Sequence, residues 1–177
     1  VYNTPPVPRI ILPDEPVFRG QTVQLHGSAT DADGDAIVDW TWELGDGTVA
    51  YGATASRAYH ELGAYLVTLW ARDSEGEVGV DTAELRVVNR PPLVVGSFAP
   101  SSPAVGETVV FSASGTDPDV PNGRVAFEWA FSDGARFDGP MVERAFASPG
   151  EHTVTLVGID ADGGASEPYV LLVRVGP

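Results

Sequence analysis

Apolar residues alternate with polar ones along several short segments of the chain. Every second residue is apolar in residues 38–44 and 65–71, and the same alternation returns in residues 125–131 and 154–156. A period of two is typical of a β-strand with one buried face. Gly, Pro and Asp-Gly turns separate these segments, and none shows the longer period of an amphipathic helix. The pattern predicts an all-β fold.

The alternation also predicts which large residues lie in the core. Val38, Trp40 and Trp42 fall on one face of the first segment. Phe127 and Trp129 fall on one face of the third segment. Because a strand projects alternate side chains to opposite faces, these five residues should share a buried face with their apolar neighbours.

The second half of the chain repeats the first. Asn3-Thr4-Pro5-Pro6 returns 86 residues later as Asn89-Arg90-Pro91-Pro92. After one inserted residue, Trp42–Gly47 is matched 87 residues later by Trp129–Gly134. We therefore predict two domains of one fold, residues 1–88 and 89–177, joined end to end by a stiff, proline-containing connector. About seven strands in each copy are typical of an immunoglobulin-like β-sandwich.

The repeated motifs resemble a known family. Trp42–Gly47, with the sequence Trp-Glu-Leu-Gly-Asp-Gly, precedes Tyr59 and Gly63, and the second copy has the same order of motifs. This order resembles that of the polycystic-kidney-disease (PKD) module, with Leu44 in place of the usual Phe and Ser132 in place of the first Gly. The resemblance implies an immunoglobulin-like sandwich of cell-surface and secreted proteins that acts as a spacer, adhesion unit or accessory domain.

Composition restricts the possible partners. The 177 residues contain 25 acidic and 10 basic residues, a formal net charge of −15, and every basic residue is Arg. Nucleic acids and anionic membrane surfaces are therefore excluded as expected partners, whereas divalent cations, cationic surfaces and glycans are compatible. No apolar stretch is long enough for a membrane insertion, and no signal peptide opens the sequence. We expect an internal fragment of a longer extracellular or cell-surface protein.

The sequence gives little support for a catalytic site. The sequence has no cysteine, which excludes disulfides and thiolate chemistry. Its three histidines, His26, His60 and His152, are far apart and lack the spacing of metal ligands. Asp31 and Asp33 could imitate a glycosidase pair, but a small sandwich offers no deep cleft for a sugar. We expect no enzymatic activity.

A calcium site is the strongest chemical candidate. Residues 31–35, with the sequence Asp-Ala-Asp-Gly-Asp, place three carboxylates in one loop, and calcium takes six to eight oxygen ligands. Trp42 at the twelfth position excludes an EF-hand. In a sandwich, ligands from separate loops can meet at one pole. The candidate ligands are Asn3, Asp31, Asp33 and Asp73 in the first copy and Asn89, Asp117, Asp119 and Asp160 in the second.

The family resemblance extends this set. Members in secreted collagenases bind calcium at similar positions, with a contribution from the residue after the Asn, here Thr4 and Arg90. The alternative is that the aspartates form ordinary turns by accepting backbone hydrogen bonds. Asp46-Gly47 and Asp133-Gly134 are expected to be hairpin turns of that kind.

Trp70 is the candidate binding residue outside the acidic loops. It lies between Leu69 and Ala71, on the opposite face from the core residues of its strand. An outward Trp could stack on a sugar ring or anchor a protein, or it could pack against a neighbouring loop or the other domain.

Together these observations predict a non-catalytic extracellular spacer or adhesion module that mediates protein–protein or protein–carbohydrate interactions, with calcium as a stabilising ligand. Two alternatives remain open. The chain could be an accessory substrate-binding module of a secreted hydrolase. It could also be a subunit of a surface layer or filament that self-associates through an edge strand.

Overall fold

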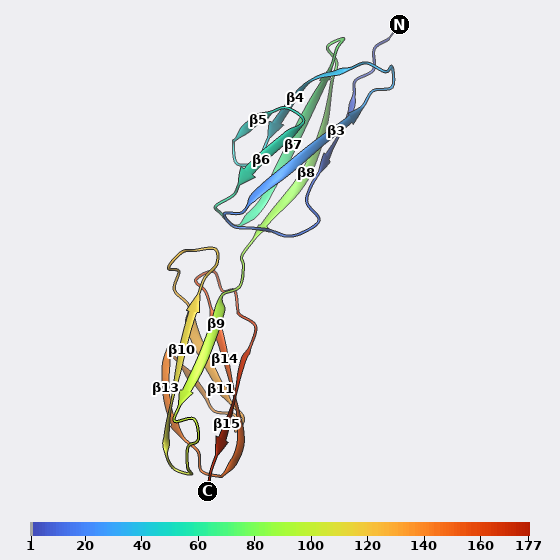
Figure 1. Ribbon diagram of the computed structural model, residues 1–177. Coiled ribbons are helices and arrows are strands. Elements are labelled where there is room, and N and C mark those ends of the chain that lie inside the picture. The colour runs from blue at the N-terminus through green and yellow to red at the C-terminus, as the bar shows by residue number, and fades with distance from the viewer. Residues whose placement is uncertain (1) are drawn as a thin grey trace. The chain divides into compact units, whose positions relative to one another are not determined.

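The computed structural model describes residues 2–177, which contain strands and turns but no helix. Among these residues there is accordingly no helix that could span a membrane. The chain divides into two compact units, Val1–Val88 (unit 1) and Asn89–Pro177 (unit 2). Each unit is a β-sandwich whose strands are joined by short loops (Figure 1). The predicted all-β, immunoglobulin-like sandwich fold is confirmed.

Unit 1 packs a three-stranded sheet, in the order β1-β3-β6, against a five-stranded sheet in the order β2-β8-β7-β4-β5. All pairs are antiparallel except β2 with β8. Its strands are β1 (Val7–Ile11), β2 (Val17–Phe18), β3 (Thr22–Thr30), β4 (Ile37–Glu43), β5 (Val49–Tyr51), β6 (Thr54–Ala58), β7 (Gly63–Asp73) and β8 (Val78–Val88). The short β2 adds an eighth strand to the seven expected.

Unit 2 packs a three-stranded sheet, in the order β13-β10-β9, against a four-stranded sheet in the order β12-β11-β14-β15. Every pair in these two sheets is antiparallel. Its strands are β9 (Leu93–Ala99), β10 (Thr108–Thr116), β11 (Ala126–Phe131), β12 (Arg136–Asp138), β13 (Met141–Ala145), β14 (Gly150–Ile159) and β15 (Tyr169–Val175).

A buried tryptophan occupies the centre of each core. Trp42 and Trp129 are fully buried, as the alternation of apolar and polar residues predicted. Each indole N–H donates a hydrogen bond to a loop carbonyl, that of Gly52 at 2.8 Å and that of Gly139 at 3.0 Å. The polar edge of each indole is therefore satisfied inside the core, which a buried Trp requires.

The position of Val38 differs from the one that alternation predicts. It was expected in the core with Trp40 and Trp42, but it is 60% exposed. The pairing of β4 with β7 shifts register between Ile37 and Asp39, and a bulge of this kind reverses the alternation of the residues before it. Trp40 is half-buried and packs against the core, as expected.

The two Asp-Gly pairs form turns, as predicted. Gly47 and Gly134 have φ angles of 81° and 91°, a region that favours glycine. Asp46 accepts a hydrogen bond from the Thr48 N–H at 3.0 Å, and its carboxylate also pairs with the Arg57 guanidinium at 2.7 Å. Unit 2 repeats this ion pair between Asp133 and Arg144. The recurring ion pair, which alternation does not reveal, attaches each turn to the neighbouring sheet.

Candidate cation sites

Three segments of unit 1 meet at one pole of the sandwich. Val7 at the start of β1 lies opposite Thr30 at the end of β3, and Ile37 at the start of β4 lies opposite Asp73 at the end of β7. Antiparallel pairing therefore brings together the segment before β1, the β3–β4 loop and the end of β7. The five predicted ligands of unit 1 lie on these segments.

Hydrogen bonds join the predicted ligands to one another. The Asn3 side-chain amide donates to Asp73 Oδ2 at 3.0 Å. Thr4 donates its backbone N–H and its hydroxyl to Asp33 Oδ2, at 2.8 and 2.5 Å. Asp31 Oδ1 accepts the backbone N–H of Asp33 at 2.9 Å. The segment before β1 is thus attached to both acidic elements of the pole.

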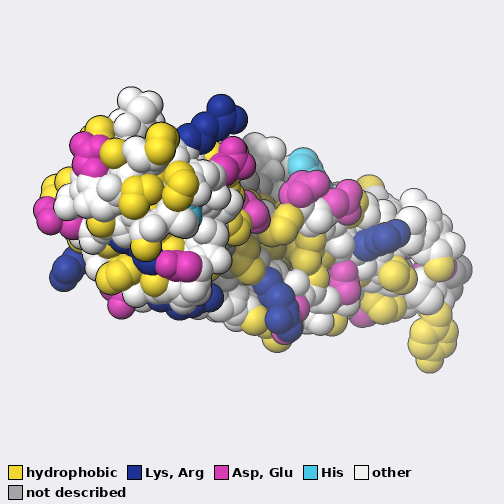
Figure 2. All heavy atoms as spheres, turned by 90° about the horizontal axis from the view of Figure 1, so that it is seen from below, with side chains coloured by type: hydrophobic (Ala, Val, Ile, Leu, Met, Phe, Trp, Pro, Cys, Tyr) yellow, Lys and Arg dark blue, Asp and Glu magenta, His cyan; other side chains and the backbone are white. Residues whose placement is uncertain are grey.

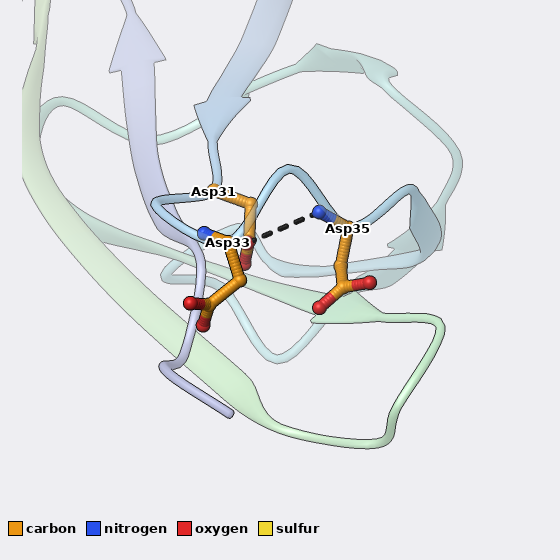
Figure 3. Close-up of side chains that lie close together, drawn as sticks. All are labelled: Asp31, Asp33 and Asp35. Atoms are coloured by element: carbon orange, nitrogen blue, oxygen red, sulfur yellow. Dashed lines mark hydrogen bonds between the residues drawn. The ribbon is translucent and has the colours of Figure 1, made fainter. Parts of the chain in front are cut away.

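Asp35 adds a third carboxylate from the same loop. The carboxylates of Asp31, Asp33 and Asp35 project from the β3–β4 loop, and the Asp35 N–H donates to Asp31 Oδ1 at 3.2 Å (Figure 3). One carboxylate oxygen from each of the three lies within 4.8 Å of the others. Asp35 stood in the acidic loop motif of the sequence but outside the predicted ligand set.

Within residues 2–177, two oxygen atoms at this pole are buried without a hydrogen-bond donor, namely Asn3 Oδ1 and Asp31 Oδ2. A buried acceptor without a partner costs about 1–3 kcal/mol, so such atoms are rare in folded proteins. Asp31 therefore uses one oxygen to form a turn and leaves the other unpaired. The turn that Asp31 forms is therefore compatible with a ligand role for its second oxygen, which stays a prediction.

The pKa values of the carboxyls reflect this crowding. Desolvation, together with the negative charges of Asp31, Glu75, Asp73 and Asp33, raises the pKa of Asp35. For Asp33, hydrogen bonds from the Thr4 hydroxyl and backbone N–H lower the pKa. Burial raises the pKa of Asp73, but hydrogen bonds from Asn3 and three backbone N–H groups outweigh it, so the net shift is downward.

Unit 2 builds the same arrangement from its own residues. The Asn89 amide donates to Asp160 Oδ2 at 2.7 Å, as Asn3 does to Asp73. The Arg90 backbone N–H donates to Asp119 Oδ2 at 2.5 Å, as Thr4 does to Asp33. Asp117 Oδ1 accepts the backbone N–H of Asp119 at 2.9 Å. All five predicted residues of the second set therefore meet at the equivalent pole.

The unpaired buried oxygens also recur in unit 2. They are Asn89 Oδ1 and Asp117 Oδ2, the counterparts of the two in unit 1, together with Asp119 Oδ1. The Arg90 guanidinium Nε lies 3.9 Å from Asp119 Oδ1, beyond hydrogen-bond distance. Amide and carboxylate oxygens are the ligands that Ca²⁺ and Mg²⁺ prefer, so both poles have donor sets suited to a hard cation.

Trp70 lies on the outer face of the five-stranded sheet, as predicted, and is 37% exposed. The strand register places it in one row with Tyr51 on β5, Thr41 on β4 and Val80 on β8. Tyr51 and Val80 are 74% and 58% exposed. The row offers apolar and aromatic surface with one hydroxyl-bearing residue between the two rings.

Unit 2 has a different row at the same place in its fold. Val157 takes the position of Trp70, Glu128 that of Thr41 and Asp138 that of Tyr51. The sandwich therefore forms with charged residues in this row, and the aromatic residues of unit 1 are not required by the fold. Only the pairing of distant strands shows that Tyr51 and Trp70 belong together.

Figure 2 shows acidic and hydrophobic side chains interspersed over the surface of each unit in one view, with Arg side chains at several places among them. Among the described residues seen in this view, neither unit by itself shows an extended basic surface of the kind that phosphate binding requires.

Comparison with known sequences finds the same family in both units. The profile of the PKD domain family matches residues 3–87 and again residues 89–173, which together make up nearly the whole chain. Collagenase ColA of Bacillus cereus is 28% identical over 71 residues, 40% of this chain. Collagenase ColA of Clostridium perfringens is 26% identical over 86 residues, 49% of this chain. The matched segments span only 7% and 8% of these two collagenases.

Among solved structures, the PKD1 domain of the Vibrio cholerae metalloprotease PrtV is 27% identical. The match covers 48% of this chain and 98% of that domain, with a TM-score of 0.42. The PKD1 domain of Vibrio anguillarum Epp is 24% identical over 49% of this chain and 96% of that domain, with a TM-score of 0.43.

Proposed function

This chain belongs to the PKD domain family, and from that premise we propose that it is a calcium-stabilised, non-catalytic module of an extracellular protein. It serves there as a spacer or adhesion unit, or as an accessory module beside a catalytic domain. The parent protein's activity and partners are part of the proposal, because the chain corresponds to a small fraction of the collagenases it matches.

The observation that carries the calcium proposal is the recurrence of unpaired oxygens. An Asn Oδ1 and an Asp Oδ2 are buried without a donor at equivalent positions in both units. The same pair of unpaired oxygens in both copies of the repeat supports a shared ligand over an accident of packing in one unit. A hard cation supplies the positive charge that these acceptors lack.

The residues that would hold the cation can be named from the donor set. In unit 1 they are Asn3, Asp31 and Asp33, with Asp35 from the same loop and Asp73 placed by its bond to Asn3. Thr4 can contribute a hydroxyl or a carbonyl oxygen. Arg90 can contribute only its carbonyl, because a guanidinium has no acceptor.

The corresponding set in unit 2 is Asn89, Asp117 and Asp119, with Asp160 placed by its bond to Asn89. In each unit, calcium would join the segment before the first strand to the acidic loop, which is the β3–β4 loop in unit 1 and the β10–β11 loop in unit 2. It would also neutralise the clustered carboxylates. Its expected role is therefore to stabilise the fold rather than to support a reaction.

Thermal unfolding tests this proposal. A ligand that binds only the folded state raises the free energy of unfolding by about 2.7 kcal/mol at a hundredfold excess over its Kd. We expect millimolar calcium to raise Tm by several degrees relative to excess EDTA, and expect the double variant Asp31→Asn with Asp117→Asn to lose this rise. Asp14→Asn, which removes one acidic charge elsewhere, is the control and should keep it. An equal Tm in calcium and EDTA for the unaltered chain would refute the proposal.

A second candidate function is binding to a polymer through the outer face of unit 1. It is favoured by the row of Tyr51, Thr41, Trp70 and Val80, whose aromatic members the fold of unit 2 does without. Tyr51 and Trp70 lie two strand spacings apart, about 10 Å. Flat aromatic rings with a hydroxyl between them suit the apolar faces and polar edges of sugar rings.

Co-sedimentation with insoluble cellulose, chitin and collagen tests this candidate. Trp70→Ala and Tyr51→Ala should each reduce binding to a polysaccharide. Tyr169→Ala is the matched control, because Tyr169 in unit 2 is also 37% exposed. Retention on collagen alone, or equal loss with the control variant, would exclude polysaccharide binding through this row.

A further inference from the structure

We propose that the two poles bind calcium with unequal affinity, because in unit 2 the positive charge of Arg90 competes with the cation for the Asp119 carboxylate. This inference rests on the proposed calcium sites and adds an order of filling to them. Unit 1 would load at low calcium concentration and unit 2 only at a higher one. Two sequence differences are the reason: Thr4 of unit 1 is replaced by Arg90, and the acidic loop of unit 2 has one carboxylate fewer.

The two poles differ in charge. In unit 1 the acidic loop supplies Asp31, Asp33 and Asp35, whose carboxylate oxygens lie within 4.8 Å of one another, and the neighbouring residue Thr4 is neutral. The corresponding loop of unit 2, residues 117–123, has two carboxylates and continues with uncharged residues. Negative charge is what attracts a divalent cation, so unit 1 has the stronger field.

Arg90 lowers the field of unit 2 further. Its backbone N–H donates to Asp119 Oδ2, and its guanidinium Nε lies 3.9 Å from Asp119 Oδ1. The Asp119 side chain is only 1% exposed, so solvent screens this attraction weakly on the carboxylate side. Asp119 Oδ1 is one of the buried oxygens without a hydrogen-bond donor. The guanidinium thus partly neutralises a carboxylate that the cation needs.

The Arg90 guanidinium should lower the calcium affinity of the unit 2 site without abolishing binding. The Arg90 side chain is 41% exposed, so solvent screens part of its charge. Three buried oxygens, those of Asn89, Asp117 and Asp119, still lack a donor in its presence. A cation at this pole must therefore overcome the repulsion of one like charge, and it remains favoured by the oxygens that Arg90 leaves unpaired.

Isothermal titration of the full chain with calcium chloride tests the inference one site at a time. Asp117→Asn leaves the unit 1 site intact, and Asp31→Asn leaves the unit 2 site intact. The Kd measured in the Asp31→Asn chain should be at least about fivefold weaker, the effect of one partly exposed charge. Circular dichroism in EDTA checks that both variants are folded.

An exchange of the two residues supplies the decisive comparison. Arg90→Thr in the Asp31→Asn chain should tighten calcium binding about fivefold, and Thr4→Arg in the Asp117→Asn chain should weaken it by a similar factor. Arg174→Thr is the charge-matched control, because Arg174 is paired with Glu151 on β14 rather than with a residue of the pole. It should leave both affinities unchanged.

The outcomes separate this inference from the proposed function. Two sites of equal Kd would overturn the inference and leave calcium binding intact, as would an Arg90→Thr variant that behaves like Arg174→Thr. Absence of calcium binding in the unaltered chain would overturn the proposed function itself, and the inference with it.

Discussion

At the scale of single residues, Asp35 illustrates the conflict between the stability of the metal-free fold and the proposed cation binding. Desolvation and four neighbouring acids raise its pKa, so its ionised form is disfavoured in the metal-free fold. The folded state therefore binds more protons than the unfolded chain near this pKa, and this contribution to stability falls as pH rises through that range. Acidic clusters of this kind are costly until a cation binds.

Replacement of Asp35 by Asn should therefore have opposite effects in the two conditions. In EDTA at pH 7, Asp35→Asn should raise Tm by a small but measurable amount, because it removes the repulsion. The rise in Tm on going from EDTA to calcium should be smaller for this variant than for the unaltered chain. A lower Tm in EDTA would show that the carboxylate has a stabilising contact, contrary to this account.

The hydrogen bonds from Thr4 make the converse prediction for Asp33. Because they lower the pKa of Asp33, they contribute stability above its ordinary pKa of about 4, and this is lost as pH falls through the folded pKa. Thr4→Val removes the hydroxyl donor. Carboxyl-carbon NMR titration in EDTA should show the Asp33 pKa rising in this variant, while the pKa of Asp46, which has other donors, stays the same.

At the scale of strands, Gly79 determines how closely β8 approaches the segment before β1. A Cβ at this position would lie 1.8 Å from the Pro6 carbonyl oxygen, so the backbone would have to move. Gly79→Ala should destabilise the protein by about 1–3 kcal/mol, as overpacking does. It should also weaken calcium binding by unit 1, because the displaced segment carries Asn3 and Thr4.

Urea unfolding and calcium titration measure the two effects of Gly79→Ala. Gly176→Ala is the control, since a Cβ at Gly176 would come no closer than 3.8 Å to the Pro103 carbonyl oxygen. A Gly79→Ala chain with unchanged stability would contradict the close packing of β8 against the segment before β1.

The sequence predicted those features that local pattern and internal repetition determine. Alternation identified the buried Trp42 and Trp129. The repeated Asn and Asp positions, together with the family resemblance for Thr4 and Arg90, identified the residues that meet at each pole. Val38 was predicted wrongly, because a bulge depends on pairing with β7 and leaves no trace in the alternation of β4. The row that joins Tyr51 to Trp70 was missed for the same reason, since strand register is a long-range property.

At the scale of the whole chain, net charge should govern the stability of the metal-free state. The formal charge of −15 implies self-repulsion, which salt screens over about 8–10 Å. In EDTA, an increase in sodium chloride should therefore raise Tm. In saturating calcium the rise should be smaller, because the poles are already neutralised. Differential scanning calorimetry measures both, and an equal salt response in the two conditions would contradict neutralisation at the poles.

The most direct test of the account is a high-resolution crystal structure of the chain grown with calcium. We predict one cation at each pole, about 2.3–2.6 Å from its oxygen ligands, including Asn3 Oδ1 and Asp31 Oδ2 in unit 1 and Asn89 Oδ1 and Asp117 Oδ2 in unit 2. Water molecules at hydrogen-bond distance from these four oxygens, with no cation at either pole, would contradict it.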